Sequence, residues 1–364
     1  MPRRLSIRLA LLIPCLMLLS TTVLAQEATQ APAAPPAETP VRFIELVGPA
    51  AESSAEISSL AWYGDYLVLL TENSFLYNQI EDSSGGVFAL EKGDILEYLD
   101  AENPEPLEPL AVPIFGPDIE DAVNGFEVTF DGFEAIKFVD DPSVFADDKV
   151  FLTIEAETVD ENDPSMRAYV VWGTVEPDLA GIHLRLEDRI ALPRQTDFGN
   201  MSYESLLVAD NRLIALYEIN GAGVNAAPLA YAIDLQSGEV TTIPLQNIEY
   251  RITDATDPDA SGVFWMPNYF FEGEDFLATD NDPIFAQFGE GASQAAFAGV
   301  ERLIALQYTG DQIVLVNQPP IQLQMTEESQ GRNWEGIARL DDRGFLIVTD
   351  RFPQTLLGFV PAGG

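Results

Sequence analysis

The sequence predicts an all-β fold, a β-propeller of five blades with six as the alternative, whose last blade is closed by the N-terminal strand. Three observations support this prediction: a hairpin unit recurs along the chain, each copy carries a small residue at the same place on its first strand, and further alternating strands follow. Recurring hairpins of this kind are typical of propeller blades. Innermost strands converge on a central axis, where only Gly, Ala or Ser leaves room for the neighbouring blade. A β-sandwich would not require a small residue at the same place in every copy.

The clearest copy of the unit spans residues 333–353, NWEGIARLDDRGFLIVTDRFP. It has an aromatic residue and an acid, then small and aliphatic residues, a turn, and an apolar strand that ends before Asp350. The opening recurs as ISSL, FEAI, YESL, TDAT and WEGI, with the small residues Ser59, Ala135, Ser205, Ala255 and Gly336. Second strands are expected over residues 66–70, 150–154, 213–217, 263–266 and 345–348.

The last unit supplies only three strands before the sequence ends, over residues 335–340, 345–349 and 355–360. Residues 41–47, VRFIELV, read as a strand that has no blade of its own. We therefore expect this N-terminal strand to complete the last blade, which removes an exposed sheet edge. The fourth unit is lengthened by residues 272–299 and carries extra strands at 300–308, 312–316 and 321–325, where a sixth blade could lie. Residues 41–364 are expected to form a single domain.

The N-terminal residues 1–25 have the pattern of a secretory signal peptide. Arg3, Arg4 and Arg8 precede an apolar run, and VLA precedes the expected cleavage site after Ala25. Residues 26–40, QEATQAPAAPPAETP, are expected to be a Pro/Ala-rich spacer that is disordered or extended. We therefore expect a secreted or periplasmic protein. No other stretch approaches the roughly 20 uninterrupted apolar residues of a membrane span, so none is expected in the mature chain.

The composition excludes several classes of partner and site. The formal net charge is -41, with 59 Asp+Glu against 18 Lys+Arg. Such a surface repels nucleic acid and anionic lipid and attracts divalent cations. Cys15 is the only cysteine and His183 the only histidine. The sequence therefore has too few of these residues for disulfides or thiolate metal sites, and almost too few for Ser/His/Asp or Cys/His catalysis. We expect a monomer that binds a small molecule.

Polar residues recur at two equivalent places of the units and are expected to meet at one mouth of the central channel. The first-strand set is Ser58, Glu134, Glu204, Asp254 and Glu335, and the second-strand ends are Asn73, Glu155, Glu218, Asn268 and Asp350. Two carboxylates about 6 Å apart repel by roughly 3 kcal/mol at an effective dielectric near 20. The ring must therefore bind a cation, stay partly protonated, be neutralised by Lys137, Arg339 or Arg351, or lie exposed at a wet rim. Oxygen-only ligands favour Ca²⁺, for which we expect Glu134, Glu204, Asp254 and Glu335 as ligands.

Three runs carry a resemblance to a known family: ITDATDPDASGVFWMPNYFFEGED, VERLIALQYTGDQIVLV and NWEGIARLDDRGFLIVTDRFPQTLLGFVP. They resemble the C-terminal half of the extracytoplasmic phytase-like, or "esterase-like activity of phytase", domains. The resemblance spans the chain from about residue 41 to its end, and residues 333–361 are its most specific piece. It implies a secreted β-propeller that hydrolyses a phosphoester or an ester, and it supplies no catalytic set that could be carried over residue by residue.

Two functional hypotheses follow, and a third has little to support it. The first is an extracytoplasmic hydrolase of a small ester or phosphoester, in which Ca²⁺ on the acid ring polarises an oxygen and Glu218 or Asp350 activates water. The second is a non-catalytic binding propeller with a structural cation, since propellers serve both roles. A lactonase-like enzyme with a histidine at the channel mouth would have only His183 to use.

Overall fold

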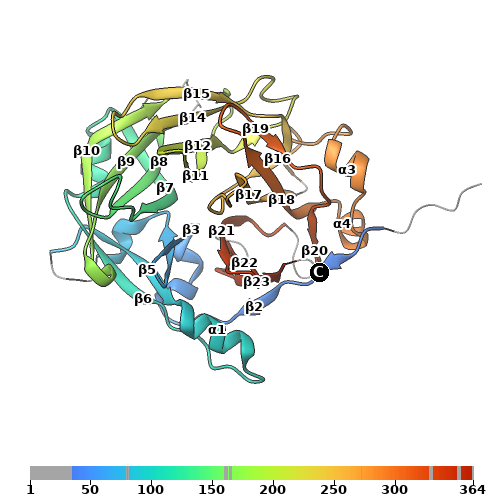
Figure 1. The fold of residues 1–364 in the computed structure, drawn as a ribbon, viewed down its shortest axis with the longest axis horizontal. Helices are drawn as coiled ribbons and strands as arrows, with labels where there is room; N and C mark the ends of the chain where they lie inside the picture. Colours follow the sequence, from blue (N-terminus) through green and yellow to red (C-terminus); the bar gives the residue numbers. More distant parts are fainter. Residues whose placement is uncertain are drawn as a thin grey trace, which may run out of the picture. The chain divides into compact units, whose positions relative to one another are not determined.

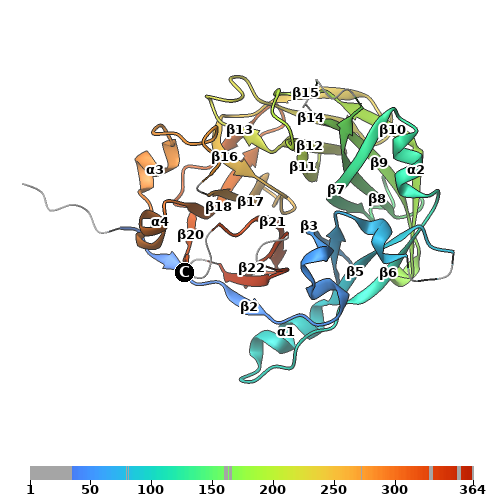
Figure 2. The same ribbon diagram turned by 180° about the vertical axis from the view of Figure 1, so that it is seen from behind.

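The computed structural model describes residues 35–362, apart from residues 79, 81, 160–162, 164–165, 272, 328–330 and 351–353. The predicted signal peptide at residues 1–25 and the first part of the predicted spacer lie outside this range. Strands dominate the described part, and they form five blades whose inner strands face a common centre (Figure 1; seen from behind in Figure 2). The predicted five-bladed propeller is therefore confirmed.

The first three blades each contain four antiparallel strands, with the inner strand first in the sequence. Blade 1 is β3 (Ile57–Tyr63), β4 (Tyr66–Thr71), β5 (Gly85–Glu91) and β6 (Leu110–Phe115). Blade 2 is β7 (Val128–Val139), β8 (Lys149–Thr158), β9 (Arg167–Val175) and β10 (Ile182–Leu192). Blade 3 is β11 (Tyr203–Ala209), β12 (Arg212–Tyr217), β14 (Leu229–Asp234) and β15 (Val240–Pro244). The outer strands β6 and β10 also pair in parallel, which joins blades 1 and 2 into one sheet.

Blade 4 contains the long fourth unit of the sequence. Its inner strand is β16 (Ile248–Ile252) continued by residues 253–256, because the Thr256 amide donates to the Trp265 carbonyl in β17. The remaining elements are β17 (Val263–Phe270), α3 (Pro283–Phe288), α4 (Ala292–Phe297), β18 (Val300–Tyr308), β19 (Ile313–Leu315) and β20 (Ile321–Leu323), with β13 (Ile219–Asn220) paired to β16. The extra predicted strands thus extend blade 4, and the described residues contain no sixth blade.

The N-terminal strand completes blade 5, as predicted. Blade 5 is β21 (Trp334–Leu340), β22 (Gly344–Thr349), β23 (Leu357–Pro361) and β2 (Arg42–Ile44), with β2 antiparallel to β23. The predicted spacer over residues 26–40 is ordered at its C-terminal end, which corrects the expected boundary. There β1 (Glu38–Thr39) pairs in parallel with β20, and the Glu38 carboxylate accepts hydrogen bonds from the amide and hydroxyl of Ser293 in α4.

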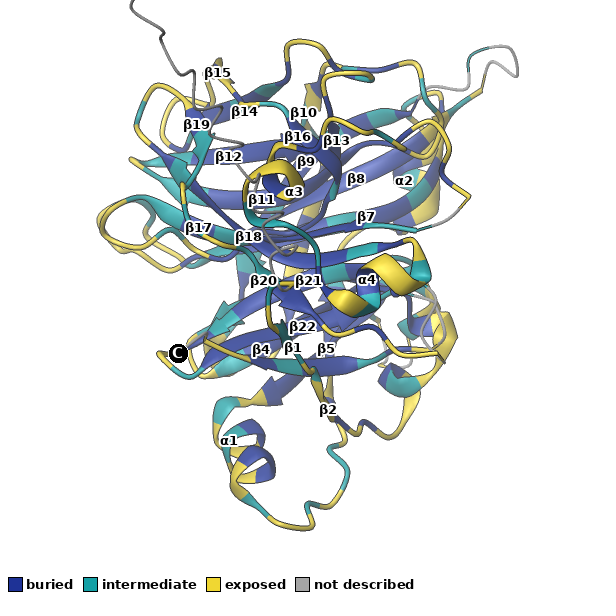
Figure 3. Cartoon of the chain, turned by 90° about the vertical axis from the view of Figure 1, so that its right-hand side faces the viewer, coloured by how far each residue is buried: buried dark blue, intermediate teal, exposed yellow. Residues whose placement is uncertain are grey.

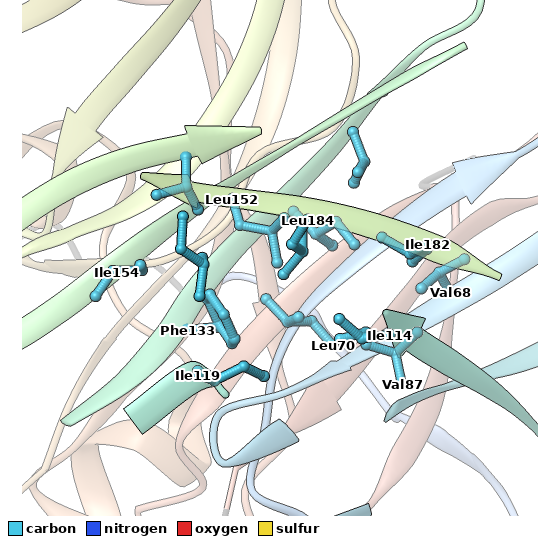
Figure 4. Close-up of a cluster of buried hydrophobic side chains, with 14 of the residues drawn as sticks. Val68, Leu70, Val87, Ile114, Ile119, Phe133, Leu152, Ile154, Ile182 and Leu184 are labelled. Atoms are coloured by element: carbon cyan, nitrogen blue, oxygen red, sulfur yellow. The ribbon is translucent and has the colours of Figure 1, made fainter. Parts of the chain in front are cut away.

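The core lies between neighbouring blades, so every sheet is buried on both faces near the axis (Figure 3). Figure 4 shows one such layer, in which Leu70 and Val87 of blade 1 pack with Phe133, Leu152 and Ile182 of blade 2. Among the described helices, which include α1 (Lys92–Asp100) and α2 (Ile119–Asn124), none is long and apolar enough to cross a membrane.

The small residues of the repeated unit are buried where the inner strands meet. A Cβ added to Gly336 would lie 2.6 Å from Val348 Cγ1 and 2.9 Å from Leu60 Cγ, so a larger side chain there would overlap blade 1. The other four positions are fully buried as well. Close approach of the inner strands therefore explains why the sequence repeats a small residue at this place.

Candidate functional site at the acidic end of the channel

A β-bulge occurs at the same place in four inner strands and turns one side chain out of the ladder. The pairing with the second strand slips between Ile57 and Ser59 in blade 1, and equivalent slips occur in β7, β11 and β21. The extra residues are Ser58, Glu134, Glu204 and Glu335. Bulges re-aim side chains next to functional sites. The predicted first-strand acids Glu134, Glu204 and Glu335 are thus structurally equivalent, at one end of the channel.

A second set of carboxylates lies at the ends of the second strands. Thr71, Tyr217 and Thr349 pair with the residue just before each bulge, and the acids that follow them are Glu72, Glu218 and Asp350. Glu155 has the same position after Ile154 in β8. The sequence prediction named Asn73, one residue too late, and that side chain instead donates to Glu56 Oε2 at 2.8 Å. The signal for Glu72 was present, because four second strands end in an acid: LVLLTE, VFLTIE, LIALYE and FLIVTD.

The two sets meet, and their proximity raises the pKa of several carboxyl groups. Burial, followed by repulsion from Glu72 and Glu155, holds the pKa of Glu134 well above its ordinary value. Burial and repulsion from Glu335 do the same to the pKa of Glu204. Burial raises the pKa of Glu335 to about 7, that of Glu155 to about 8 and that of Glu72 to about 9. Near neutral pH this end of the channel therefore requires bound protons or a bound cation.

Arg251 and Tyr269, which the sequence did not indicate, are the polar partners inside this cluster. Arg251 is paired with Glu218 and lies 2.6 Å from Glu274 Oε1. The Tyr269 hydroxyl donates to Glu335 Oε1 at 2.6 Å. The bases expected to neutralise the ring are elsewhere: Lys137 and Arg339 line a pocket at the other end of the inner strands. Arg351 lies outside the described residues.

Several buried carboxylate oxygens have no hydrogen-bond donor. Within the described ranges these are Glu155 Oε1, Glu204 Oε2, Glu218 Oε2 and Glu274 Oε2, and all four side chains are at least nine-tenths buried. A buried charged oxygen without a partner is costly, and native proteins normally satisfy it. A hard cation would satisfy such oxygens. In the part of the chain that the structure describes, however, no three acidic, His or Cys side chains are already arranged as a metal site. Binding would need side-chain rotation.

Asp254 is separated from the other predicted ligands because its oxygens bind backbone amides. Its side chain is fully buried, and its Oδ2 accepts from the amides of Leu60 and Ile337, each at 2.9 Å. Its Oδ1 accepts from the amide of Ala255 at 2.8 Å. Burial raises the pKa of Asp254 to about 7, and the charge of Lys137 opposes that shift. Asp254 therefore ties the inner strands of blades 1, 4 and 5 together below the acidic cluster.

The two remaining predicted residues are also placed by polar contacts. Asn268 donates to the carbonyls of Glu249 and Arg251 and accepts from Arg302 Nε, so it braces blade 4. His183 lies on the outer strand β10, exposed, with Nε2 2.6 Å from Glu176 Oε1 and its ring stacked on Phe115. Neither contact places a histidine at the channel.

Comparison with known proteins shows the likeness only at the level of fold. No family model and no curated protein matches the chain. An exo-β-1,3-galactanase from Phanerochaete chrysosporium is 6% identical with a TM-score of 0.43 over 88% of this chain and 63% of that chain. A soluble aldose sugar dehydrogenase from Escherichia coli is 11% identical, with a TM-score of 0.40 over 88% and 99%. A GH43 β-1,3-galactosidase is 9% identical, with a TM-score of 0.45 over 88% and 94%. At these scores nothing about activity follows, and the phytase-like resemblance stays a prediction.

Proposed function

We propose that the protein is a hydrolase of a small ester or phosphoester whose acidic channel end binds Ca²⁺. The observation that carries the proposal is the set of buried carboxylate oxygens without donors, surrounded by carboxyl groups whose pKa is raised. An extracytoplasmic location, as the N-terminal residues predict, would supply the calcium.

The chemistry of the donor set fits Ca²⁺ better than a transition metal. The cluster offers only oxygen ligands, and Ca²⁺ accepts six to eight of them in flexible geometry. We assign Glu134, Glu204 and Glu335 as ligands from the bulges, with Glu155 from β8. Asp254 is left out because three amides already bind its oxygens. When bound, the cation would polarise the phosphoryl or carbonyl oxygen and offset the charge of an anionic substrate.

Asp350 and Glu218 have different roles in this proposal. Asp350 is partly exposed at the end of β22, close enough to raise the pKa of Glu335 and Glu72, so it is our candidate for activating water. Glu218, the other residue predicted for this role, is fully buried and paired with Arg251. Its task in this proposal is to hold Arg251 beside the cluster.

A binding propeller with a structural cation is the second candidate, and the position of Glu218 favours it. With Glu218 held by Arg251, only one of the two predicted water-activating carboxylates can reach a ligand. In that case the cation would stabilise the blades, and the acidic end would bind a ligand without changing it.

Release of 4-nitrophenol from its phosphate and acetate esters, with Ca²⁺ and with chelator, tests the proposal. We expect turnover only with Ca²⁺, a loss of about 100-fold or more in Asp350→Asn, and no change in the exposed control Glu239→Gln. Calcium-dependent stabilisation without turnover of either ester would favour the binding propeller. Turnover that survives chelation would contradict the calcium-dependent mechanism.

A further inference from the structure

A pocket of about 400 Å³ lies at the end of the channel opposite the acidic cluster. Its lining residues follow the bulge positions along the inner strands, so they lie where those strands finish. Leu60 and Ile337 form its floor, and their amides bind Asp254 below it. The pocket is therefore separated from the acidic end by the Asp254 contacts. Its volume is in the range of small-molecule sites.

This pocket brings together three cations and three aspartates in a strongly acidic chain: Lys92, Lys137, Arg339, Asp257, Asp259 and Asp341. The lysines of the sequence are Lys92, Lys137 and Lys149, and the first two line the pocket together with Arg339. Lys137 is only 5% exposed, and its Nζ lies 3.0 Å from Asp257 Oδ1. Burying a lysine side chain is costly, so its place here needs a reason beyond surface charge.

Two of the aspartates at this pocket are more exposed than the lysines with which they pair. The Asp257 side chain is 67% exposed, against 6% for its partner Lys137. The Asp341 side chain, which pairs with Lys92 at 2.9 Å, is 52% exposed. Exposed ion pairs contribute little and exchange readily, so an entering anion can compete with these aspartates.

Aromatic rings fix two of the cations in place. Lys92 Nζ lies 4.9 Å from the ring centroid of Trp62, and the Arg339 guanidinium lies 5.2 Å from that of Phe345. Trp62 is itself anchored, because its indole N–H donates to the Arg339 carbonyl at 2.8 Å. A guanidinium held by a ring presents its planar set of donors in a fixed direction, which suits an oxyanion.

We propose that this pocket binds a small organic molecule that carries one oxyanion, a carboxylate or a phosphate, beside an apolar ring. Arg339 and Lys92 contact the oxyanion, and the apolar part rests on Leu60, Ile337 and Trp62. The site does not depend on the proposed hydrolase, because it lies on the other side of Asp254 and uses none of the acidic cluster.

Calorimetric titration of the mature chain with phenylphosphonate, benzoate and benzyl alcohol tests this site. The three probes share a ring and differ in the anion. We expect saturable binding of at least one anion, with benzyl alcohol weaker by about tenfold or more, since a charge-assisted contact is lost. Phenylphosphonate alone would indicate a phosphate site, and benzoate alone a carboxylate site; either supports the proposal.

Matched variants distinguish anion binding in the pocket from nonspecific attraction to a positive side chain elsewhere. Arg339→Gln and Lys92→Gln should each weaken anion binding about tenfold or more. Lys149→Gln should leave it unchanged, because Lys149 does not line the pocket. If Arg339→Gln fails to fold, Lys92→Gln carries the test, since Lys92 is partly exposed at the start of α1. Absence of saturable binding by both anions, equal binding of benzyl alcohol, or an equal loss in Lys149→Gln would overturn the proposal.

Discussion

The carboxyl groups of Glu204 and Glu335 come from different blades, yet after burial it is repulsion from Glu335 that contributes most to the raised pKa of Glu204. An ionised carboxylate has no hydrogen to donate, so two of them can meet only around a proton or a cation. Tyr269 occupies one oxygen of Glu335 and cannot serve both groups. The protonation of this pair therefore depends on pH when no metal is bound, and on bound calcium when the pH is fixed.

Without metal, the free energy of unfolding should fall as pH rises from about 4.5 to about 9. The pKa values of Glu335, Glu155 and Glu72 are raised to about 7, 8 and 9, chiefly by burial, whereas the unfolded chain loses these protons near the ordinary value. Over that range the folded state binds more protons, so rising pH favours unfolding. Urea unfolding in chelator at several pH values measures the slope.

A variant makes this pH prediction specific to the cluster. Replacing Glu72 and Glu155 together by Gln should reduce the slope above about pH 7, because two groups whose pKa is raised to about 9 and about 8 no longer titrate. Asp100, Asp234 and Asp259 titrate below their ordinary pKa and so do not contribute in this window. A stability that stays level or rises between pH 5 and 9 would contradict the raised values.

Calcium should raise the melting temperature of the wild-type protein, and Glu335→Gln should abolish the effect while leaving the fold intact. A cation that binds only the native state stabilises by RT ln(1 + [L]/Kd), about 2.7 kcal/mol at a hundredfold excess over Kd. Gln keeps the shape of Glu335 and loses its charge, so packing does not change. Differential scanning fluorimetry with Ca²⁺ and with chelator measures this, with Glu239→Gln as the exposed control. An unchanged wild-type melting temperature would show that the cluster does not bind Ca²⁺.

Much of the fold and part of the site follow from the repeated unit. The first-strand acids Glu134, Glu204 and Glu335 could be predicted because each directly precedes the small residue of its copy, where a bulge recurs in four of the five inner strands. The second set was predicted correctly at Glu155, Glu218 and Asp350 and missed by one residue in blade 1, where Glu72 and not Asn73 follows the residue that pairs with Ile57. The acid at the end of the second strand was visible in the sequence there too, but the asparagine beside it was chosen.

Residues that reach the site from outside the repeat could not be predicted. Arg251 belongs to β16, which precedes the repeated opening of the fourth unit, and Glu274 lies in the long connection after β17. Asp254 has the same sequence context as the other acids, yet its backbone is left-handed, with φ 34°, and its side chain binds amides of neighbouring blades. The position of the Asp254 side chain depends on contacts between blades, which cannot be predicted from the neighbouring sequence.

Deleting the N-terminal strands should destabilise the protein in two steps. A chain that begins at Pro35 should melt like one that begins at Gln26. A chain that begins at Val41 lacks β1 and the Glu38 contacts to Ser293, so its melting temperature should fall. A chain that begins at Gly48 also lacks β2, which exposes the edge of β23, and should melt far lower or aggregate. Equal melting of all four chains would rule out closure of blade 5 by β2.

Asp254→Ala should destabilise the propeller more than Asp254→Asn. Alanine leaves the buried amides of Leu60, Ile337 and Ala255 without an acceptor, and each unsatisfied amide costs about 1–3 kcal/mol. Asparagine keeps one carbonyl oxygen for Leu60 and Ile337 and tolerates the left-handed backbone, so we expect a loss of only about 1–2 kcal/mol.

Urea unfolding gives the two free energies, and amide hydrogen exchange at Leu60 and Ile337 shows whether the loss is local to these contacts. Asp257→Ala serves as the control, because Asp257 is exposed and its carboxylate accepts a hydrogen bond from the Lys137 side chain. Faster exchange at both amides in Asp254→Ala, with near-normal exchange in Asp254→Asn, is the expected pattern. Equal destabilisation by Asn and Ala would mean that the charge of Asp254, held opposite Lys137, matters more than its role as an acceptor.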